Sequence, residues 1–490
     1  MLNYHNRPED FGMSSKKLLE FIETTEKDDG ISLKTFMLLR ENHVLTQFSK
    51  EPYSLNDQHL LFSMTKFITS LGACIAVDKG YLKWDDLVIS YYPEELPRSY
   101  NNDFSQISLK DLLLVCAHHQ TNGYHMIFLK KSWPKLFLAQ EFIHKPGIYN
   151  RYNTHCAHIL SAIIERATSQ SLLDFLNKHL FQPLDIPKPQ WETSPSGVTA
   201  GGMGLSLTTD AMAKIGIMIL NKGLYQGKKI IAEYNMHAAI WLYMYKHIEE
   251  DQDRGLNTGM HQDEHLHLRI DNCYRLDGDF GQVCLIIPDK KLIVIATSRQ
   301  TNADVLIKYI YRYIVHPLAA NTHQDDYEVL DKKLKTLRYS LCRPSLVYLP
   351  EKMPELHKRS YLLKDNPNDM VKLVFTKEGC QYKLLIKNQY DQDYTVQFDY
   401  AHQVKSDGVF IKDIQCHEQT YISYARWESP YRLMVQVIYL ETPYEVTYGF
   451  LFKDDKIEML FHINTSFTLK SCTVEGYLDM SKQIKSIKLR

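Results

Sequence analysis

The chain has 490 residues, which is long enough for two domains that each bury a sizeable core. Its 57 Lys and Arg residues balance 58 Asp and Glu residues, which excludes a general electrostatic attraction to nucleic acid or to an anionic membrane. No apolar run is long enough for a signal segment or a membrane span, and nine scattered cysteines without a C-x-x-C pair predict reduced thiols in a cytoplasm.

The first elements in chain order are a helix and a pair of strands. Residues 14–28 have the spacing of an amphipathic helix, and residues 32–48 predict two short strands around Glu41-Asn42. An extended run, Gln58–Phe62, then passes into an apolar helix from Phe67 to Asp78. The junction between this run and the helix carries the most informative motif of the chain.

Ser63 and Lys66 stand three residues apart at this junction, so their side chains are expected on one face of the first helical turn. A serine hydroxyl becomes an effective nucleophile when a neighbouring base takes its proton, and a lysine with a lowered pKa can do so. The N–H groups of a helix N-terminus also favour the negative charge of acyl transfer. The alternative role for Ser63 is a helix N-cap, and the motif alone leaves both roles open.

Two other segments match the same Ser-x-x-Lys pattern, Ser14–Lys17 and Ser132–Lys135. Ser14 opens a polar amphipathic helix and is interpreted as its N-cap. Pro134 disfavours a helical conformation at Trp133, which would spoil the one-turn geometry that Ser132 needs. We therefore expect the functional motif at Ser63, where an extended run precedes a helix.

The rest of the N-terminal region alternates helices with strands. Strands at both ends with helices between them predict one mixed domain whose terminal segments share a sheet. The predicted elements are helices at 108–115, 154–168 and 171–180, an apolar helix that Thr208–Asp210 caps and that ends at Leu220, strands at 281–287 and 291–296, and a helix at 303–315.

Composition changes near residue 320. From Leu346 onward the chain is rich in Tyr, Val, Ile and Thr, with turn signals at Glu378-Gly, Asp407-Gly and 453–455. This pattern predicts an antiparallel sandwich or barrel of about eight strands. We expect a first domain at 1–320, a linker at 321–345 and a β domain at 346–490.

Several segments, taken together over residues 12–316, resemble the serine β-lactamase and penicillin-binding-protein-like hydrolases, on the branch of class C enzymes and related esterases. The resemblance implies an α+β fold in which an antiparallel sheet is flanked by helices and joined to a helical subdomain, followed here by the small all-β domain. The segments are Ser63–Lys66, Leu112–His119, Pro146–Thr154, Ile159–Glu165, Phe181–Ile186, Gly201–Leu205, Lys214–Gly223 and Tyr274–Gln282, the last on an edge strand.

The same resemblance implies a role for each catalytic group. Ser63 would attack a carbonyl and form an acyl-enzyme, while Lys66 and Tyr152 would share the proton transfers. The backbone N–H groups of Ser63 and Asp279 would form the oxyanion hole. Gly278, one residue earlier, would leave the strand edge open for substrate.

The chain departs from the family pattern at two positions. Thr154 stands where the family's Tyr-x-Asn motif has asparagine, and Asn153 lies one residue too early to replace it. Leu276 stands where a lysine or histidine commonly holds a substrate carboxylate. The absence of this cation favours esters or small amides without a carboxylate as substrates over β-lactams and peptidoglycan stems. Arg275 or Arg269 could replace the missing cation.

Other polar residues near the expected cleft have two interpretations each. Asp277 and Asp279 favour a cationic or neutral substrate, or they are solvated carboxylates at a strand end. His119 is a candidate substrate contact, although a histidine in such a turn is more often structural. The segment His261–His265 fits an inverted zinc motif, but its surroundings predict a loop and a strand, so we expect no metal.

The leading hypothesis is a cytoplasmic serine hydrolase that acts on a small-molecule ester or amide without a cofactor, and without nucleic acid or membrane partners. The alternative is a catalytically weakened relative that binds a small molecule or a protein partner in the cleft, because Thr154 and Leu276 depart from the pattern. A D-amino-acid-specific peptidase is a third hypothesis. Two roles stay open for the C-terminal sheet, covering the cleft and forming a homodimer contact.

Overall fold

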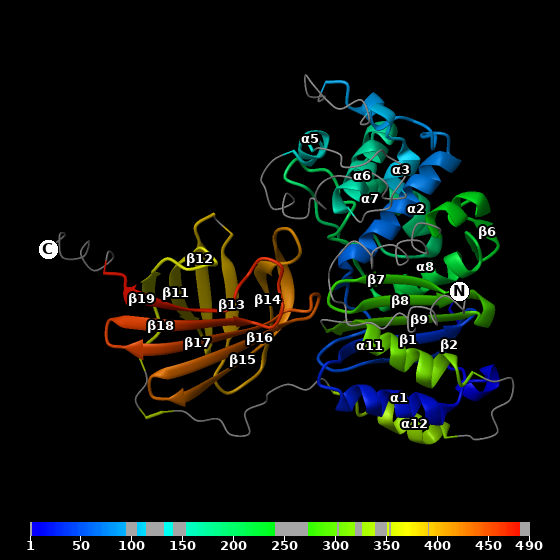
Figure 1. Cartoon of the computed structure of the whole chain (residues 1–490). Coiled ribbons are helices and arrows are strands. Elements are labelled where there is room, and N and C mark those ends of the chain that lie inside the picture. The colour runs from blue at the N-terminus through cyan, green and yellow to red at the C-terminus, as the bar shows by residue number, and fades with distance from the viewer. Residues whose placement is uncertain are drawn as a thin grey trace. The chain divides into compact units, whose positions relative to one another are not determined.

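The structure is a computed structural model that forms two compact units, residues 1–339 and 340–490 (Figure 1). Each unit has its own sheet and its own buried core. Among the described helices, none is both long and apolar enough to cross a membrane. The structure describes residues 2–94, 105–113, 132–140, 153–240, 273–300, 303–318, 326–338, 350–351, 354–390 and 392–480.

The described part of the first unit is built on a five-stranded antiparallel sheet in the order β2-β1-β9-β8-β7. Strand β1 pairs with β9, and Phe36 lies opposite Ala296. Segments from both ends of the unit therefore share one sheet, as the sequence predicts. The strands are β1 (Ser32–Arg40), β2 (His43–Ser49), β7 (Tyr274–Gly278), β8 (Gln282–Ile287) and β9 (Leu292–Arg299).

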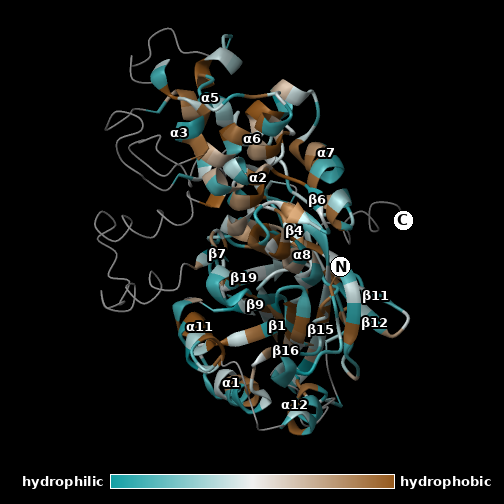
Figure 2. Ribbon diagram, turned by 90° about the vertical axis from the view of Figure 1, so that its right-hand side faces the viewer, coloured by the Kyte–Doolittle hydropathy of each residue, from teal (hydrophilic) through white to brown (hydrophobic). Residues whose placement is uncertain are grey.

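Helices cover both faces of this sheet. Successive side chains of a strand point to opposite faces, so each strand contributes to two separate cores. Met37 and Ile295 face a core that includes α8, whereas Phe36 and Val294 face a core formed with α1 and α11. Figure 2 shows hydrophobic and hydrophilic segments side by side along α1. The covering elements are α1 (Ser15–Lys27), α8 (Thr209–Leu220), α11 (Ala303–Ile310), the π-helical turn η8 (Tyr311–Val315) and α12 (Tyr327–Leu334).

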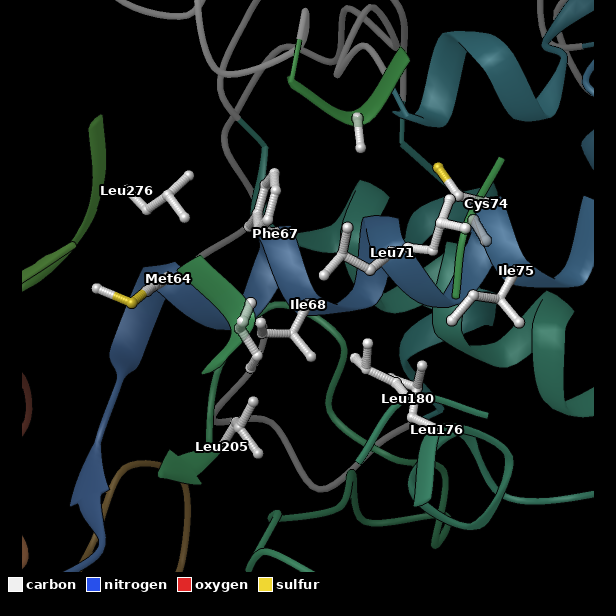
Figure 3. Close-up of a cluster of buried hydrophobic side chains, with 14 of the residues drawn as sticks. Met64, Phe67, Ile68, Leu71, Cys74, Ile75, Leu176, Leu180, Leu205 and Leu276 are labelled. Carbon is white, nitrogen blue, oxygen red and sulfur yellow. The ribbon is translucent and has the colours of Figure 1, made fainter. Parts of the chain in front are cut away.

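A helical subdomain surrounds α2, which is buried along nearly its whole length. Its side chains Phe67, Leu71 and Ile75 lie in one hydrophobic cluster with Leu176 and Leu180 (Figure 3). Helix α6 packs along α2. The α+β fold with a helical subdomain is therefore confirmed. Its helices are α2 (Thr65–Asp78), α3 (Leu109–Leu113), α5 (Trp133–Leu138), α6 (Thr154–Thr168) and α7 (Leu172–Leu176).

Local structure differs from the sequence predictions at two places. Trp133 is helical, contrary to the expectation, because Pro134 occupies the first turn of α5, where a proline displaces no helical hydrogen bond. Helix α2 begins at Thr65 rather than at Phe67, directly after a short 3₁₀ turn, η2 (Phe62–Met64). The predicted cap at Ser14 is confirmed, since its hydroxyl accepts a hydrogen bond from the Lys17 amide.

The second unit is an antiparallel, barrel-like sheet, as expected, but its described residues form ten strands rather than about eight. Turns are predicted from the sequence at Gly and Asp residues, but some hairpin turns lack both, such as the turn between Ser429 and Arg432. Within 321–345, expected as a linker, α12 packs against α1 and buries Leu330. The strands are β10 (Arg359–Leu363), β11 (Met370–Glu378), β12 (Gln381–Asn388), β13 (Tyr394–Phe398), β14 (Val404–Ile411), β15 (Cys416–Ser429), β16 (Arg432–Tyr439), β17 (Glu445–Lys453), β18 (Lys456–Ile463) and β19 (Cys472–Leu478).

The two end strands of this sheet, β13 and β14, lie against each other, and hydrogen bonds to side chains join β13 both to β14 and to the next strand, β15. The Val409 amide donates to Thr395 Oγ1 at 2.9 Å. The Gln397 amide donates to the Tyr421 hydroxyl at 2.6 Å, and Ser423 Oγ donates to the Gln397 carbonyl at 2.5 Å. We call these contacts the seam of the barrel.

The seam predicts different effects for two tyrosine-to-phenylalanine changes. Tyr421→Phe leaves the Gln397 amide without its acceptor, so it should lower the free energy of unfolding by about 1–3 kcal/mol. Tyr439→Phe removes a buried hydroxyl that has no hydrogen-bond partner among the described residues, so it should be neutral or stabilising. Urea denaturation of the full chain and hydrogen exchange at the Gln397 amide measure both effects. Equal destabilisation by the two changes would contradict the role of the seam.

Candidate active site

Ser63 lies in the turn η2, immediately before α2. The preceding residue, Phe62, has a φ of 48°, a left-handed conformation that is strained for a bulky residue. Its buried ring packs edge-on against Phe280 with ring centroids 5.1 Å apart. This turn leaves the Ser63 side chain partly exposed while Phe62 and Met64 on either side are buried.

The hydroxyl of Ser63 contacts one cationic and one anionic side chain. Lys66 Nζ lies 3.1 Å from Ser63 Oγ, and Ser63 Oγ donates to Asp279 Oδ2 at 3.2 Å. The cap position of α2 belongs to Met64, so Ser63 does not hold it. Ser63 therefore does not have the N-cap role that the sequence leaves open, and its role as a nucleophile stays a prediction.

Lys66 is buried, with only 5% of its surface exposed. Its ammonium donates to the Gly202 carbonyl at 2.9 Å in addition to its contact with Ser63. Thr69, one turn later, donates to the Gly201 carbonyl at 2.7 Å. These bonds satisfy polar groups that would be costly to bury unpaired, and they fix the direction of the lysine side chain.

The glycine pair that receives these bonds lies directly against α6. A Cβ atom at Gly201 would lie 2.2 Å from the Ala157 carbonyl oxygen, and one at Gly202 would lie 2.8 Å from the Thr154 carbonyl oxygen. Only glycine allows such a close approach of two backbones. Sequence reasoning identified this segment as a family match but missed the Gly202 carbonyl as a partner of Lys66.

Strand β7 approaches Ser63 from the other side. A Cβ atom at Gly278 would lie 2.0 Å from the Leu61 carbonyl oxygen, so β7 and the residues before η2 are in backbone contact. Within the described residues β7 is the edge strand of its sheet, as expected. Asp279 follows directly in the turn to β8, which allows its carboxylate to reach Ser63.

Two hydrogen bonds from β9 hold the turn that carries Asp279. The Gln300 amide, just past the end of β9, donates to the Phe280 carbonyl at 3.1 Å, and Ser298 Oγ donates to the Gly281 carbonyl at 2.7 Å. Phe280 and Gly281 both have positive φ values, which a tight turn of this kind requires. The position of Asp279 is therefore fixed by the sheet and not only by its contact with Ser63.

Arg275 is shared by two carboxylates. Its guanidinium lies 3.0 Å from Asp277 and 2.7 Å from Asp304 of α11. Burial alone lowers the pKa of Arg275, but the two carboxylates outweigh burial and raise it. Arg275, expected as one replacement for the missing cation, is thus engaged in ion pairs, and Asp277 is paired with it rather than with Ser63.

Leu276 belongs to the hydrophobic core. It is 3% exposed and lies beside Met64 and Phe67 in the cluster around α2 (Figure 3). The position at which family members commonly carry a cation is therefore filled by packed apolar side chains. Leu276 offers a substrate no charge and no hydrogen bond.

Asn153 and Thr154 lie at the start of α6, and both are buried. The Asn153 side chain accepts a hydrogen bond from the His155 amide at 2.9 Å and caps the helix. Thr154 contributes the carbonyl against which Gly202 packs. In this structure both residues support α6 and the glycine pair beside Lys66.

Several expected site residues lie outside the described residues, so their geometry stays a prediction. They are Tyr152, His119, Arg269 and the segment His261–His265. Among the residues that the structure describes, no group of three or more His, Cys, Asp or Glu side chains has a metal-binding arrangement.

The sequence model of the Beta-lactamase family matches residues 38–315. The 6-aminohexanoate-dimer hydrolase of Paenarthrobacter ureafaciens is 22% identical over 214 residues, covering 40% of this chain and 54% of that protein. The lovastatin esterase of Penicillium rubens is 25% identical over 168 residues, covering 29% and 41%. The chain thus spans about half the length of the curated relatives it matches. A penicillin-binding protein homologue from Caulobacter crescentus, a solved structure, has a TM-score of 0.46 and 15% identity over 63% of this chain and 99% of its own.

The cap at Asn153 predicts how two substitutions differ in stability. Asn153→Ala removes the acceptor of the His155 amide and should lower the free energy of unfolding by about 0.5–2 kcal/mol. Asn153→Asp keeps an acceptor at the helix N-terminus and should retain most of the stability. Thermal and urea unfolding measure the difference. If Asn153→Ala abolished turnover at unchanged stability, the residue would act on substrate instead.

Proposed function

The chain belongs to the Beta-lactamase family, and on that premise we propose that it is a serine hydrolase that cleaves a small ester or amide through an acyl-enzyme on Ser63. One observation carries the proposal, the 3.1 Å contact between Ser63 Oγ and Nζ of the buried Lys66. A nucleophile and a base within hydrogen-bond distance are the first requirement of covalent catalysis. The names of the two curated relatives, a 6-aminohexanoate-dimer hydrolase and a lovastatin esterase, support a hydrolytic reaction.

In the proposed reaction, Ser63 Oγ attacks the carbonyl carbon while neutral Lys66 accepts its proton. The bond to the Gly202 carbonyl supports this role, because it keeps Nζ directed toward Ser63 before substrate arrives. Lys66 and Tyr152 then return a proton to the leaving group as the carbon–oxygen or carbon–nitrogen bond breaks. Water hydrolyses the acyl-enzyme by the reverse sequence of proton transfers and releases the acid.

The tetrahedral intermediate carries a negative oxygen, and we assign the backbone N–H groups of Ser63 and Asp279 to it. The contact between Gly278 and the Leu61 carbonyl supports this assignment, because it brings the two segments that carry these N–H groups together. A side chain at position 278 would push them apart.

The surroundings of β7 support a substrate without a carboxylate. Leu276 is part of the core, and Arg275 is engaged by Asp277 and Asp304. Asp279 would repel an anionic group close to Ser63. These observations favour esters and small amides over β-lactams and peptidoglycan stems; a D-amino-acid-specific peptidase remains within the amide class.

A second candidate function is the binding of a small molecule or a protein partner without turnover. The departures at Thr154 and Leu276 favour it, since both replace a polar group of the family pattern. The two candidates differ in whether Ser63 forms a covalent bond.

Substitution of the motif tests covalent catalysis. Ser63→Ala should remove essentially all ester turnover and all labelling by a fluorophosphonate probe, with little change in melting temperature. Lys66→Ala should cause a similar loss of turnover, because the two residues act as a unit. The matched control is Ser14→Ala in the other Ser-x-x-Lys segment, which should cost about 0.5–2 kcal/mol of stability through the lost cap and leave turnover intact. Absence of labelling in a folded wild-type protein would favour the binding function.

Substrate selectivity provides a separate prediction. Without a cation at position 276, a chromogenic cephalosporin should be hydrolysed with a kcat/KM about 10- to 150-fold below that of a short-chain nitrophenyl ester, which is the value of one charge-assisted contact. Parallel steady-state assays with the same enzyme preparation measure the ratio. Equal or faster hydrolysis of the cephalosporin would mean that another residue binds its carboxylate.

A further inference from the structure

The carboxylate of Asp279 is an unusual neighbour for a serine nucleophile. Asp279 Oδ2 accepts the hydroxyl hydrogen of Ser63 at 3.2 Å, at an exposed position where substrate would enter. The contacts of Phe280 and Gly281 with β9 fix the turn independently of this bond. The carboxylate is therefore part of the site that a substrate meets.

The charge of Asp279 is not neutralised by an ion pair within the described residues. Arg275, three residues before Gly278 in the strand, is already shared by Asp277 and Asp304. The ammonium of Lys66 is buried and directed at Ser63 and at the Gly202 carbonyl. A negative charge beside the nucleophile opposes formation of an oxyanion, and a positive charge on the substrate next to Asp279 would offset it.

We infer that Asp279 is a specificity-determining residue that binds an ammonium group on the carbon next to the scissile carbonyl, so that the substrates are α-amino esters or amides. The inference rests on the proposed function and names the substrate class for the same site. In this class the ammonium would take over the hydrogen bond that Asp279 now receives from Ser63. Ser63 would then be released to attack.

The geometry limits where the ammonium can stand. An amino nitrogen on the adjacent carbon lies about 2.5 Å from the carbonyl carbon, as set by standard bond lengths and angles. Because Oγ attacks that carbon while Asp279 Oδ2 lies 3.2 Å from Oγ, an acyl group oriented with its amino nitrogen on the Asp279 side brings that nitrogen within hydrogen-bond reach of the carboxylate. An amino group at the far end of an extended acyl chain would not.

The test compares two isosteric acyl groups. Alanyl and isobutyryl nitrophenyl esters differ only by an ammonium in place of a methyl group, and both alanyl enantiomers are assayed because the contact does not specify chirality. Rates are measured at about pH 6, below the ordinary α-amino pKa, and are corrected for spontaneous hydrolysis. For the better alanyl enantiomer, Asp279→Asn should reduce the alanyl-over-isobutyryl preference in kcat/KM by about 10- to 100-fold. Asparagine keeps the backbone N–H and the size of the side chain.

The matched control is Asp277→Asn, which removes an equal charge two residues earlier, in β7, from a carboxylate bonded to Arg275. Its preference should stay within about twofold of the wild type. The inference is overturned if Asp279→Asn keeps the preference, if it slows both esters equally as loss of a general base would, or if Asp277→Asn has the same effect. Ser63→Ala distinguishes failure of the proposed function from failure of the inference. Turnover that survives Ser63→Ala refutes the proposed function itself. If Ser63→Ala abolishes turnover but Asp279→Asn keeps the wild-type preference, only the inference is refuted.

Discussion

The candidate site depends on backbone segments that touch each other with no side chain between them. Gly278 lies against the Leu61 carbonyl, and Gly201 and Gly202 lie against the first turns of α6. These approaches bring together residues that are 136 and 216 positions apart in the chain, Lys66 with Gly202 and Ser63 with Asp279. A Cβ atom at any of the three glycines would lie within 3 Å of a backbone carbonyl oxygen, so the segments would have to move apart.

Much of the fold follows from local sequence patterns, whereas the detail of the site does not. The apolar strands β8 and β9 and the capped helix α8 are visible in the sequence because period and cap chemistry are local properties. The Ser63 motif is visible for the same reason. The bond between Ser63 and Asp279 and the role of the Gly202 carbonyl are not, because both arise from contacts between distant segments. Trp133 shows that a local rule can also be wrong. Proline disrupts the interior of a helix, but Pro134 is accommodated in the first turn of α5, and Trp133 is helical.

Leu276 changes what holds the edge strand in place. In a site with a cation at this position, the side chain must stay solvated or paired, and it can form an ion pair with a substrate. Here the side chain is buried against Met64 and Phe67, which contributes roughly 1.5–3 kcal/mol of hydrophobic stabilisation. The strand is thereby attached to the start of α2 by packing, and the recognition of charge moves to the turn that follows it.

The topology of the C-terminal barrel has a consequence for how it folds. Strands β10–β13 and β14–β19 form two series of antiparallel hairpins, each between chain neighbours, whereas the pairing of β10 with β19 joins Tyr361 to Leu478. Local hairpins close quickly. Pairing β10 with β19 instead brings together distant parts of the chain, and the chain loses conformational entropy before any contact between the two strands forms. The β10–β19 pairing is therefore the slow, ring-closing step. During synthesis on the ribosome the barrel must remain an open sheet until the last strand has emerged.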